Sequence, residues 1–425
     1  MDIEGIFRLY RKLLPSEFLQ KLDGDCRRGG IFSTALVVWL LLWQRLEGGI
    51  SLSTVMKGTA LGKWSTLSGG SKRVKERRIS EKTGGYSQAR TRLSVSAAVA
   101  ITDRVFQKLI ERAPRCEGQR ALFAVDGTTI ALSSTPSVKR RYPPSQNQCG
   151  SSNSGILHVV VAHDLLTGYA ARPAYGACMG PAVMTEAQLC RELLPRLPED
   201  AVVVGDRNFG IFVSVFDITS SGRDVLVRLT GNRADKVARS KVSSGTDIAV
   251  TWQPSSDERR KYPHLPAGAS VEGRVICQTV ATRDGKRADL IVFTTLPDPA
   301  VKVLEMYALR WRLETDLRTL KKTVNLDHIS AKSPEMLAKE LLLGIAAYNL
   351  VHAFIAAAAA RTRVPARSFS FSETLAIVRQ ATPLLLTART RDERTQLLEK
   401  MLALAIRARL PHRRKPPDAG VEQEN

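Results

Sequence analysis

The chain has 425 residues, with 63 Lys and Arg against 41 Asp and Glu, and so a formal net charge of +22. This length predicts two to four packed units, each able to bury a core without disulfides. Such an excess of positive charge favours a polyanionic partner, nucleic acid first, over a basic protein with no nucleic-acid role.

The six cysteines have no CxxC pair and no Cys/His ligand spacing, so they suggest neither a zinc module nor a disulfide framework and fit a reducing cytosol. The first residues are acidic and lack the order of a secretory signal. Residues 341–360 carry no charge over the length of a membrane span. Their alanines, with Asn349 and His352 among them, favour a helix buried between protein layers. We therefore expect no membrane partner and a place in the bacterial cytoplasm, at the nucleoid.

Residues 1–118 are expected to form a helical, basic DNA-binding domain. Ser33 is a plausible N-cap for a helix through Trp43, and Gly48-Gly49 ends it before Ser51 starts another. This outline is typical of a helix-turn-helix, or equally of two ordinary core helices joined by a glycine turn.

A polar, glycine-bearing stretch over residues 67–85 predicts an exposed basic loop, and Ser87 is expected to cap the helix that follows it. The candidate DNA contacts here are Lys72 and Arg73 in the loop and Arg90 and Arg92 on the helix. The alternative is an ordinary solvated surface.

The middle of the chain predicts a mixed α/β core made of residues 119–229 and 288–330. Short apolar strands over 121–125 and 129–132 are expected to meet at a turn-like Asp126-Gly127, and a strand over 201–204 leads into Gly205-Asp206. Further expected elements are a strand over 156–162, a helix over 185–194, a strand over 290–295 and a long helix over 301–323.

Three other regions complete the predicted organisation. Residues 230–287 have strand-like pieces, many turns and little helical period, which indicates a β-rich insertion. Residues 331–410 are expected to be helical and are a candidate dimerisation region. The tail, 411–425, is Pro-rich and charged, which predicts disorder.

The long helix carries the first chemical signal. At about 100° per residue, Tyr307, Arg310, Glu314 and Lys321 fall within roughly a 60° arc and share one edge of the helix. A neighbouring stripe can bury on a sheet; it consists of Met306, Leu309, Leu313, Leu317 and Leu320. A carboxylate is thus predicted at the rim of the sheet between two cations, unless the pattern is only a surface ion-pair ladder.

The strand ends carry the second signal, because sites in α/β sheets collect where strands end. Asp126 and Asp206 each follow or end a short apolar strand. Two carboxylates brought together there would repel each other unless a divalent cation lay between them. Mg²⁺ prefers such hard oxygen ligands, and two ions about 3.5 to 4 Å apart can drive phosphodiester cleavage. Asp126, Asp206 and Glu314 are therefore the predicted catalytic and metal-binding residues.

These residues resemble a known family. The spacing from Tyr307 through Arg310 and Glu314 to Lys321 is similar to the Tyr-Arg-Glu-Lys signature of the insertion-sequence-four family of DDE transposases. Gly205-Asp206-Arg207-Asn208 and Val125-Asp126-Gly127-Thr128 resemble the segments that hold that family's two aspartates. The resemblance covers about residues 85–355.

The resemblance implies an RNase H-like core in which Asp126, Asp206 and Glu314 bind two Mg²⁺ ions, for which Mn²⁺ could substitute. Water would hydrolyse the phosphodiester at each transposon end, and the freed 3′-hydroxyl would attack target DNA. Tyr307, Arg310 and Lys321 would contact double-stranded DNA at the terminal inverted repeats. A homodimer would pair both ends, and relatives often cut the second strand through a DNA hairpin.

The chain departs from the family pattern at Asn208, where relatives often have Gly, and on the strand 290–293, which lacks the tryptophan that some relatives use to hold a flipped base. Trp252 and Trp311 are candidates for that role, but both are expected in the core. Asp164 is interpreted as a turn residue, and Asp316 points away from the signature edge. His158, His163 and His328 are interpreted as structural.

Two alternative functions are compatible with some of these features. A domesticated DNA-binding protein would retain the basic surface without the chemistry, and an RNase H-like nuclease would act on other DNA without transposition. Short inverted repeats flanking the coding region would favour the transposase.

Overall fold

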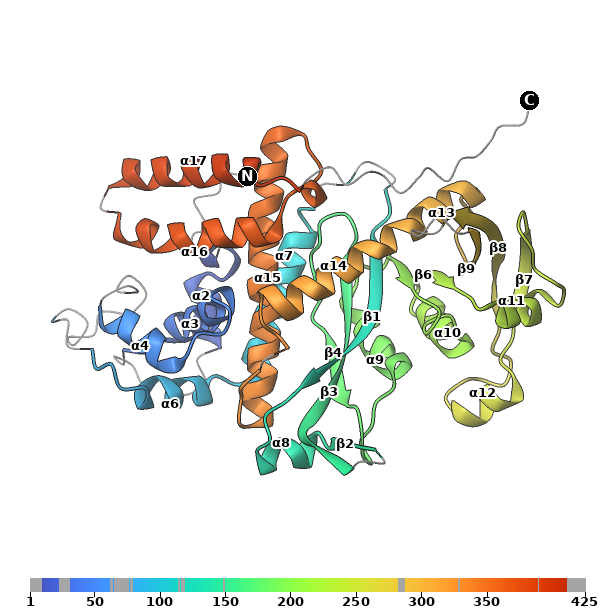
Figure 1. Ribbon diagram of the computed structural model, residues 1–425, viewed down its shortest axis with the longest axis horizontal. Coiled ribbons are helices and arrows are strands. Elements are labelled where there is room, and N and C mark those ends of the chain that lie inside the picture. The colour runs from blue at the N-terminus through green and yellow to red at the C-terminus, as the bar shows by residue number, and fades with distance from the viewer. Residues whose placement is uncertain are drawn as a thin grey trace.

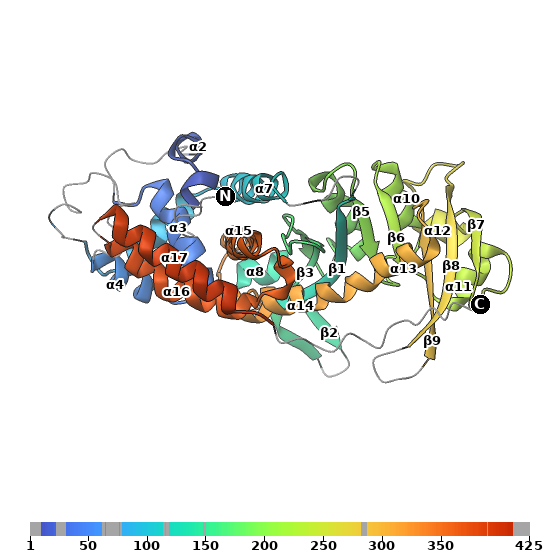
Figure 2. The ribbon, with the colours of Figure 1, turned by 90° about the horizontal axis from the view of Figure 1, so that it is seen from above.

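A computed structural model describes residues 10–22, 31–61, 64, 76, 79–113, 115, 119–147, 150–281, 287–327, 329–388 and 390–410. The molecule is elongated, with helices gathered at one end, a sheet in the middle and the strands β7 and β8 at the other end (Figures 1 and 2). The candidate loop residues Lys72 and Arg73, together with the predicted disordered tail, lie outside the described residues.

The N-terminal region is helical where it is described, with helices α2 (Ser16–Lys21), α3 (Thr34–Leu46), α4 (Leu52–Ala60), α6 (Gly84–Arg92) and α7 (Val95–Ile110). The predicted N-caps Ser33 and Ser51 are confirmed, because their hydroxyls accept hydrogen bonds from the first turns of α3 and α4. The predicted cap Ser87 is wrong, because α6 begins at Gly84 and Ser87 lies inside it. Gly48 and Gly49, which link these helices, adopt positive φ. All residues of α3 except Ala35 are buried, so α3 is a core helix.

One mixed sheet forms the centre of the molecule, in the order β2-β3-β1-β5-β6-β9-β8-β7, with β4 paired to β3. Strands β1, β5 and β6 run parallel to one another, and the remaining pairs are antiparallel. The bounds are β1 Leu122–Ala131, β2 Pro144–Asn147, β3 Gly150–Asp164, β4 Ala174–Ala177, β5 Val202–Gly205, β6 Asp224–Arg228, β7 Asp247–Trp252, β8 Val271–Ala281 and β9 Arg287–Thr294. The mixed α/β class is therefore confirmed.

One expectation about this sheet needs correction. Asp126 and Gly127 do not form a turn, because β1 continues through them and pairs with β3 from Phe123 to Ala131. In the region 230–287, strands β7 and β8 extend the central sheet through β9, which pairs with β6. The region also contains helices α11 (Gly231–Ala238) and α12 (Ser256–Lys261), so it is not made of strands alone.

Helices cover both faces of the sheet, as α10 and α13 show from above (Figure 2). On one face, Leu122, Ala124, Val202 and Val204 pack with Val303 of α13 (Ala300–Ala308). On the other, the alternate strand residues pack with α9 (Glu186–Leu193) and α10 (Phe212–Ser220). Because successive side chains of a strand point to opposite faces of the sheet, this alternation determines which side chains meet at the site.

Helix α15 (Pro334–Thr362) contains the long uncharged segment. It is long and apolar enough to span a membrane, but 89% of its apolar window is buried within the protein. It lies against α3 and α7 on one side and against α16 (Phe371–Thr387) and α17 (Arg391–Arg407) on another (Figure 1). The expectation of a helix buried between protein layers is confirmed.

Candidate active site

The pairing of parallel strands places the two predicted aspartates side by side. Leu122 of β1 pairs with Val202 of β5, and Ala124 pairs with Val204. Continuing this register by two residues sets Asp126 level with Asp206. Ala124 and Val204, two residues before the aspartates, face α13. Because side chains alternate between the faces along a strand, the two carboxylates lie on that face of the sheet as well.

The surroundings of Asp126 disfavour its ionised form. Asp126 accepts a hydrogen bond from the Gly127 N–H at 2.8 Å, and Asp206 accepts one from the Asn208 N–H, also at 2.8 Å. Burial and the charge of Asp206 nevertheless raise the pKa of Asp126 to about 6. A half-buried pair of acids that repel each other in this way suits a hard divalent cation.

A third acid close to Asp126 is Glu186, which the sequence did not single out. A Cβ atom on Gly127 would lie 2.0 Å from Glu186 Oε1, so only glycine leaves room for this carboxylate. Its other neighbour is His158, whose Nε2 lies 3.8 Å from Glu186 Oε1 and whose Nδ1 lies 2.9 Å from the Met184 carbonyl oxygen. Glu186 approaches from the α9 face, opposite the aspartate pair. The Thr185–Gln188 capping box reveals the start of α9 but not this contact.

An arginine at the next strand end was also missed. Gly205 of β5 pairs with Val227 of β6, so the same register sets Asp206 level with Arg228. Arg228 is exposed, and its charge opposes the rise in the pKa of Tyr307 that burial causes. The strand-end argument that identified the aspartates would have identified Arg228 as well.

The predicted Glu helix is continuous but irregular. A 3₁₀ turn (Leu309–Trp311) follows α13, then come α14 (Arg312–Arg318) and a π-helical turn (Thr319–Thr323). The leucine stripe is confirmed, since Leu313 and Leu320 are buried. A 3₁₀ turn advances about 120° per residue instead of 100°, so it shifts the rotation of Glu314 relative to Tyr307. Tyr307 is buried, whereas the side chain of Glu314 is 66% exposed. The shared edge of the four signature residues stays a prediction.

Arg310 connects Glu314 with the aspartates. Its guanidinium lies 3.8 Å from Glu314 Oε1 and 5.9 Å from the centre of the Tyr307 ring. Its charge also opposes the rise in the pKa of Asp126 that burial and Asp206 cause. One step of the ion-pair ladder, between Arg310 and Glu314, is thus present.

The predicted metal ligands are only partly assembled. In the part of the chain that the structure describes, no three Asp, Glu, His or Cys side chains stand close enough to hold one ion. The structure brings Asp126 and Asp206 together and leaves Glu314 apart from them. The donor set at the pair is carboxylate oxygen, which fits Mg²⁺ or Mn²⁺ and not a soft metal.

The two helical DNA-binding candidates lie in different surroundings. Arg92 is exposed at the end of α6. Arg90 is buried, and its guanidinium forms an ion pair with Glu340, which also binds Arg45. Because a buried, paired guanidinium is not free to bind phosphate, the expectation for Arg90 is corrected to an internal role.

The two candidate tryptophans also differ. Trp252 is buried between Phe212 and Phe293, as expected for a core residue. Trp311 is 50% exposed on the 3₁₀ turn next to the Glu314 segment, contrary to the expectation of a core position.

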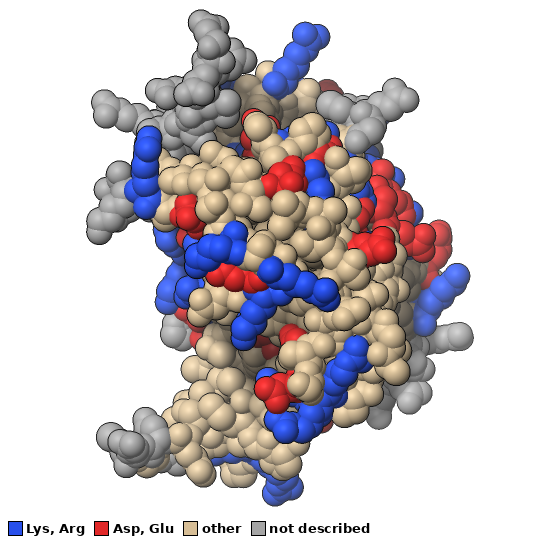
Figure 3. All heavy atoms as spheres, turned by 90° about the vertical axis from the view of Figure 1, so that its right-hand side faces the viewer, with Lys and Arg blue, Asp and Glu red and all other residues tan. Residues whose placement is uncertain are grey.

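The far end of the sheet is not uniformly basic. Figure 3 shows Lys and Arg side by side with Asp and Glu on the face that ends in the α11 and α12 region. The α11 and α12 region includes two ion pairs, Arg260 with Asp257 at 2.7 Å and Lys241 with Asp235 at 3.0 Å. The positive charge of the chain is therefore not concentrated on this face.

The fold and the level carboxylates define an α/β protein with an RNase H-like core. Residues 117–350, more than half of the chain, match the transposase DDE domain, and the chain belongs to that family. It is also similar to the transposase InsG for insertion sequence element IS4 of Escherichia coli strain K12, with 23% identity over 237 residues. That match covers 54% of this chain and 51% of the relative, so the chain spans about half the length of the curated relative that it matches.

Proposed function

We propose that this protein is a transposase that binds transposon ends and then cuts and joins DNA with Asp126, Asp206 and Glu314. The observation that carries the proposal is the parallel register of β1 and β5, which sets two carboxylates level at one point of a DDE domain. The spacing of Tyr307, Arg310, Glu314 and Lys321 supports membership of the insertion-sequence-four group within this family.

Asp126 and Asp206 would hold divalent ions, with two Mg²⁺ in the full site and Mn²⁺ as a substitute. When bound, such ions activate the attacking oxygen and neutralise charge on the leaving oxygen. Glu314 is the third proposed ligand and is paired with Arg310 in the absence of DNA. A DNA phosphate competes for a guanidinium more strongly than an exposed carboxylate does, so phosphate binding at Arg310 would free Glu314 to join the aspartates.

DNA contacts are proposed for three cations around this point, of which Arg228 is exposed and Arg310 and Lys321 are partly buried. Arg228 stands beside Asp206, Arg310 beside Glu314, and Lys321 follows α14. Arg92 and the loop residues Lys72 and Arg73 would bind phosphates further along the duplex. Tyr307 was expected to contact DNA, but it is buried under Arg310 and would instead orient that guanidinium. Two copies of the chain would pair both transposon ends in the bacterial cytoplasm, with residues 331–410 as the candidate contact between them.

The test is cleavage of DNA that carries the element's own ends, in Mg²⁺, by the wild type and by Asp126→Ala, Asp206→Ala and Glu314→Ala. Each substitution should reduce cutting by about 10³-fold or more and leave end binding within a few fold, because each removes a ligand and not a phosphate contact. Asp257→Ala, which changes an exposed acid of α12 that pairs only with the exposed Arg260, is the control and should cut like the wild type.

Other results would support a different function. Wild type that binds the ends without cutting would indicate a domesticated DNA-binding protein. Cutting that ignores the element's ends and gives no strand transfer would indicate an RNase H-like nuclease. Cutting that survives all three substitutions would show that the site lies elsewhere.

A further inference from the structure

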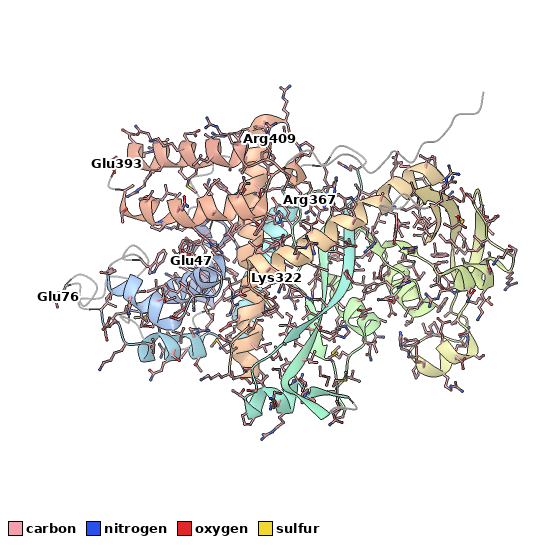
Figure 4. The ribbon with its side chains drawn as sticks, in the orientation of Figure 1. Glu47, Glu76, Lys322, Arg367, Glu393 and Arg409 are labelled. Atoms are coloured by element: carbon pink, nitrogen blue, oxygen red, sulfur yellow. The ribbon has the colours of Figure 1, made fainter. Side chains whose placement is uncertain are left out.

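The segment that carries Glu314 is held by a buried ion pair. Asp316 lies two residues after Glu314, and its side chain is only 4% exposed. Its two carboxylate oxygens accept hydrogen bonds from Arg367 Nη1 at 2.6 Å and Nη2 at 2.8 Å. Figure 4 labels Arg367 above α14 and beside the upper part of α15, and Arg367 is far along the chain from Glu314. The C-terminal region therefore reaches the segment that carries the proposed third ligand.

Arg367 binds the central sheet at the same time. It donates hydrogen bonds to the carbonyl oxygens of Asp164 at 3.0 Å and Leu165 at 3.3 Å, at the end of β3. Arg312, two residues before Glu314, donates to the same Leu165 carbonyl at 2.9 Å. The Glu314 segment is thus tied to β3 on both sides of Glu314, once directly and once through Arg367.

The surroundings of this pair are closed and mostly uncharged. His163 and His352 line the same enclosure, and burial lowers the pKa of His163 to about 4 and of His352 to about 3, so both are neutral. A Cβ atom on Gly168 would lie 2.5 Å from the His352 ring and 3.1 Å from Arg367 Nη1. Because little space remains around the guanidinium, its position is well defined.

The local helix geometry explains why this segment needs such an anchor. α14 has seven residues and lies between a 3₁₀ turn and a π-helical turn. Such irregular turns alter the rotation of a helix and often mark functional hinges. Glu314 is exposed, so packing of its own side chain does not fix its direction. Leu313 and Asp316 are the buried side chains of α14, and Asp316 alone has a directional partner among them.

We propose that Asp316 and Arg367 are positioning residues that set the rotation of α14 and thereby aim Glu314 at the aspartate pair. This inference rests on the proposed role of Glu314. It gives the C-terminal region a part in the chemistry of its own chain, separate from any contact between two copies.

The test uses a variant that removes the pair without leaving a buried charge, Asp316→Leu with Arg367→Met. Replacing a buried ion pair by apolar side chains of similar size often leaves stability unchanged, whereas removing one partner is strongly destabilising. The matched control is Arg361→Met with Glu399→Leu, which removes a second bidentate pair from the C-terminal region at 2.6 and 3.0 Å without touching α14.

Two readouts are measured on each full-length protein. The first is single-turnover cutting of transposon-end DNA beside its binding. The second is iodide quenching of Trp311, which is half exposed and three residues from Glu314, while the other four tryptophans are buried. Loss of the pair should change Trp311 quenching and reduce the cutting rate by about 100-fold with unchanged binding, as a misplacement of about 1 Å can do. The control should change neither.

Several outcomes separate this inference from the proposed function. Cutting by the folded double variant at the wild-type rate overturns the inference. If the double variant does not fold, Arg367→Lys, which keeps the charge and loses the bidentate contact, takes its place with the same expected and contrary results. A wild type that cuts no DNA defeats the proposed function, and unchanged Trp311 quenching in the variant then defeats the positioning role separately.

Discussion

The ionised form of Asp126 is electrostatically unfavourable in the folded protein without metal. Burial and the charge of Asp206 raise its pKa to about 6, although the Gly127 N–H and Arg310 act in the opposite direction. In the unfolded chain an aspartate titrates near 3.9. Folding without metal therefore favours the protonated form of Asp126 and disfavours the ionised form.

Because the pKa of Asp126 is higher in the folded protein than in the unfolded chain, the free energy of unfolding depends on pH. A raised folded pKa contributes stability below about pH 4, and this contribution is lost as the pH rises through about 6. In EDTA, Asp126→Asn should therefore exceed the wild type in free energy of unfolding by about 1–2 kcal/mol at pH 7.5, after allowance for solvent screening. The difference should shrink towards pH 4.5, and Mg²⁺ should reverse it by stabilising the wild type. Denaturant unfolding at both pH values measures it, and a difference independent of pH would contradict this account.

At the scale of elements, the turn that carries Asp206 packs tightly on the next strand. A Cβ atom on Gly210 would lie 2.1 Å from the Arg228 carbonyl oxygen of β6. Because this oxygen belongs to the backbone of a strand, a side chain at position 210 would force the strand or the turn to move. Gly210 therefore permits the close approach that sets Asp206 beside Arg228. The turn is further fixed by hydrogen bonds from Arg233 to the carbonyl oxygens of Arg207 and Gly210.

Gly210→Ala should consequently destabilise the protein by about 1–3 kcal/mol through overpacking. It should also lower the cutting rate more than DNA binding, because the turn that carries Asp206 must move. Gly231→Ala is the control, since nothing lies within 4 Å of a Cβ atom there and the residue begins α11. Thermal unfolding and cutting of both variants provide the comparison, and equal effects of the two substitutions would refute the argument.

Local patterns predicted most of the elements but not their relations. Ser33 and Ser51 predicted the starts of α3 and α4 because an N-cap depends on nearby residues alone. Asp126-Gly127 was misread as a turn because glycine also serves close approach, here of Glu186 from a helix about 60 residues away. The helix over 301–323 was predicted as uniform, and no local pattern revealed the 3₁₀ turn within it.

In the candidate site, too, local sequence patterns did not reveal contacts between residues far apart in the chain. Strand ends identified Asp126 and Asp206, and register then explains why they meet. Arg90 was misassigned because its partner, Glu340, is 250 residues away and neutralises a charge that looks free in the sequence. Trp311 was expected in the core because aromatic residues usually are, yet it is half exposed.

At the scale of the whole molecule, buried ions join the N-terminal helices to the sheet-bearing part. Glu340 of α15 binds Arg45 of α3 and Arg90 of α6, and Lys339 donates to the Arg90 carbonyl oxygen at 3.1 Å. Arg45 also donates to the Asn325 carbonyl oxygen, just after the π-helical turn. The basic N-terminal region is therefore held in a defined orientation relative to the Glu314 segment.

Helix α6 carries two arginines with different proposed roles: Arg90 is internal and Arg92 faces DNA. Arg90→Ala should lower the melting temperature, because it leaves Glu340 with one partner fewer. Arg92→Ala should leave the melting temperature unchanged but weaken binding to transposon-end DNA and reduce the slope of log K against log salt by about one unit. Melting curves and binding at several salt concentrations distinguish them, and a reversed pattern would contradict the assignment of the two side chains.

The central claim is that Asp126 and Asp206 bind the divalent ion that cuts DNA, and exchange of ligand and metal tests it most directly. Asp126→Cys and Asp206→Cys replace a hard oxygen ligand with a softer thiolate, which binds Mg²⁺ poorly and Mn²⁺ better. Each variant should cut transposon-end DNA at least about 100-fold more slowly than the wild type in Mg²⁺ and regain about tenfold or more in Mn²⁺. Cutting at the wild-type rate in Mg²⁺, or equal loss in both metals with DNA binding intact, would contradict the claim.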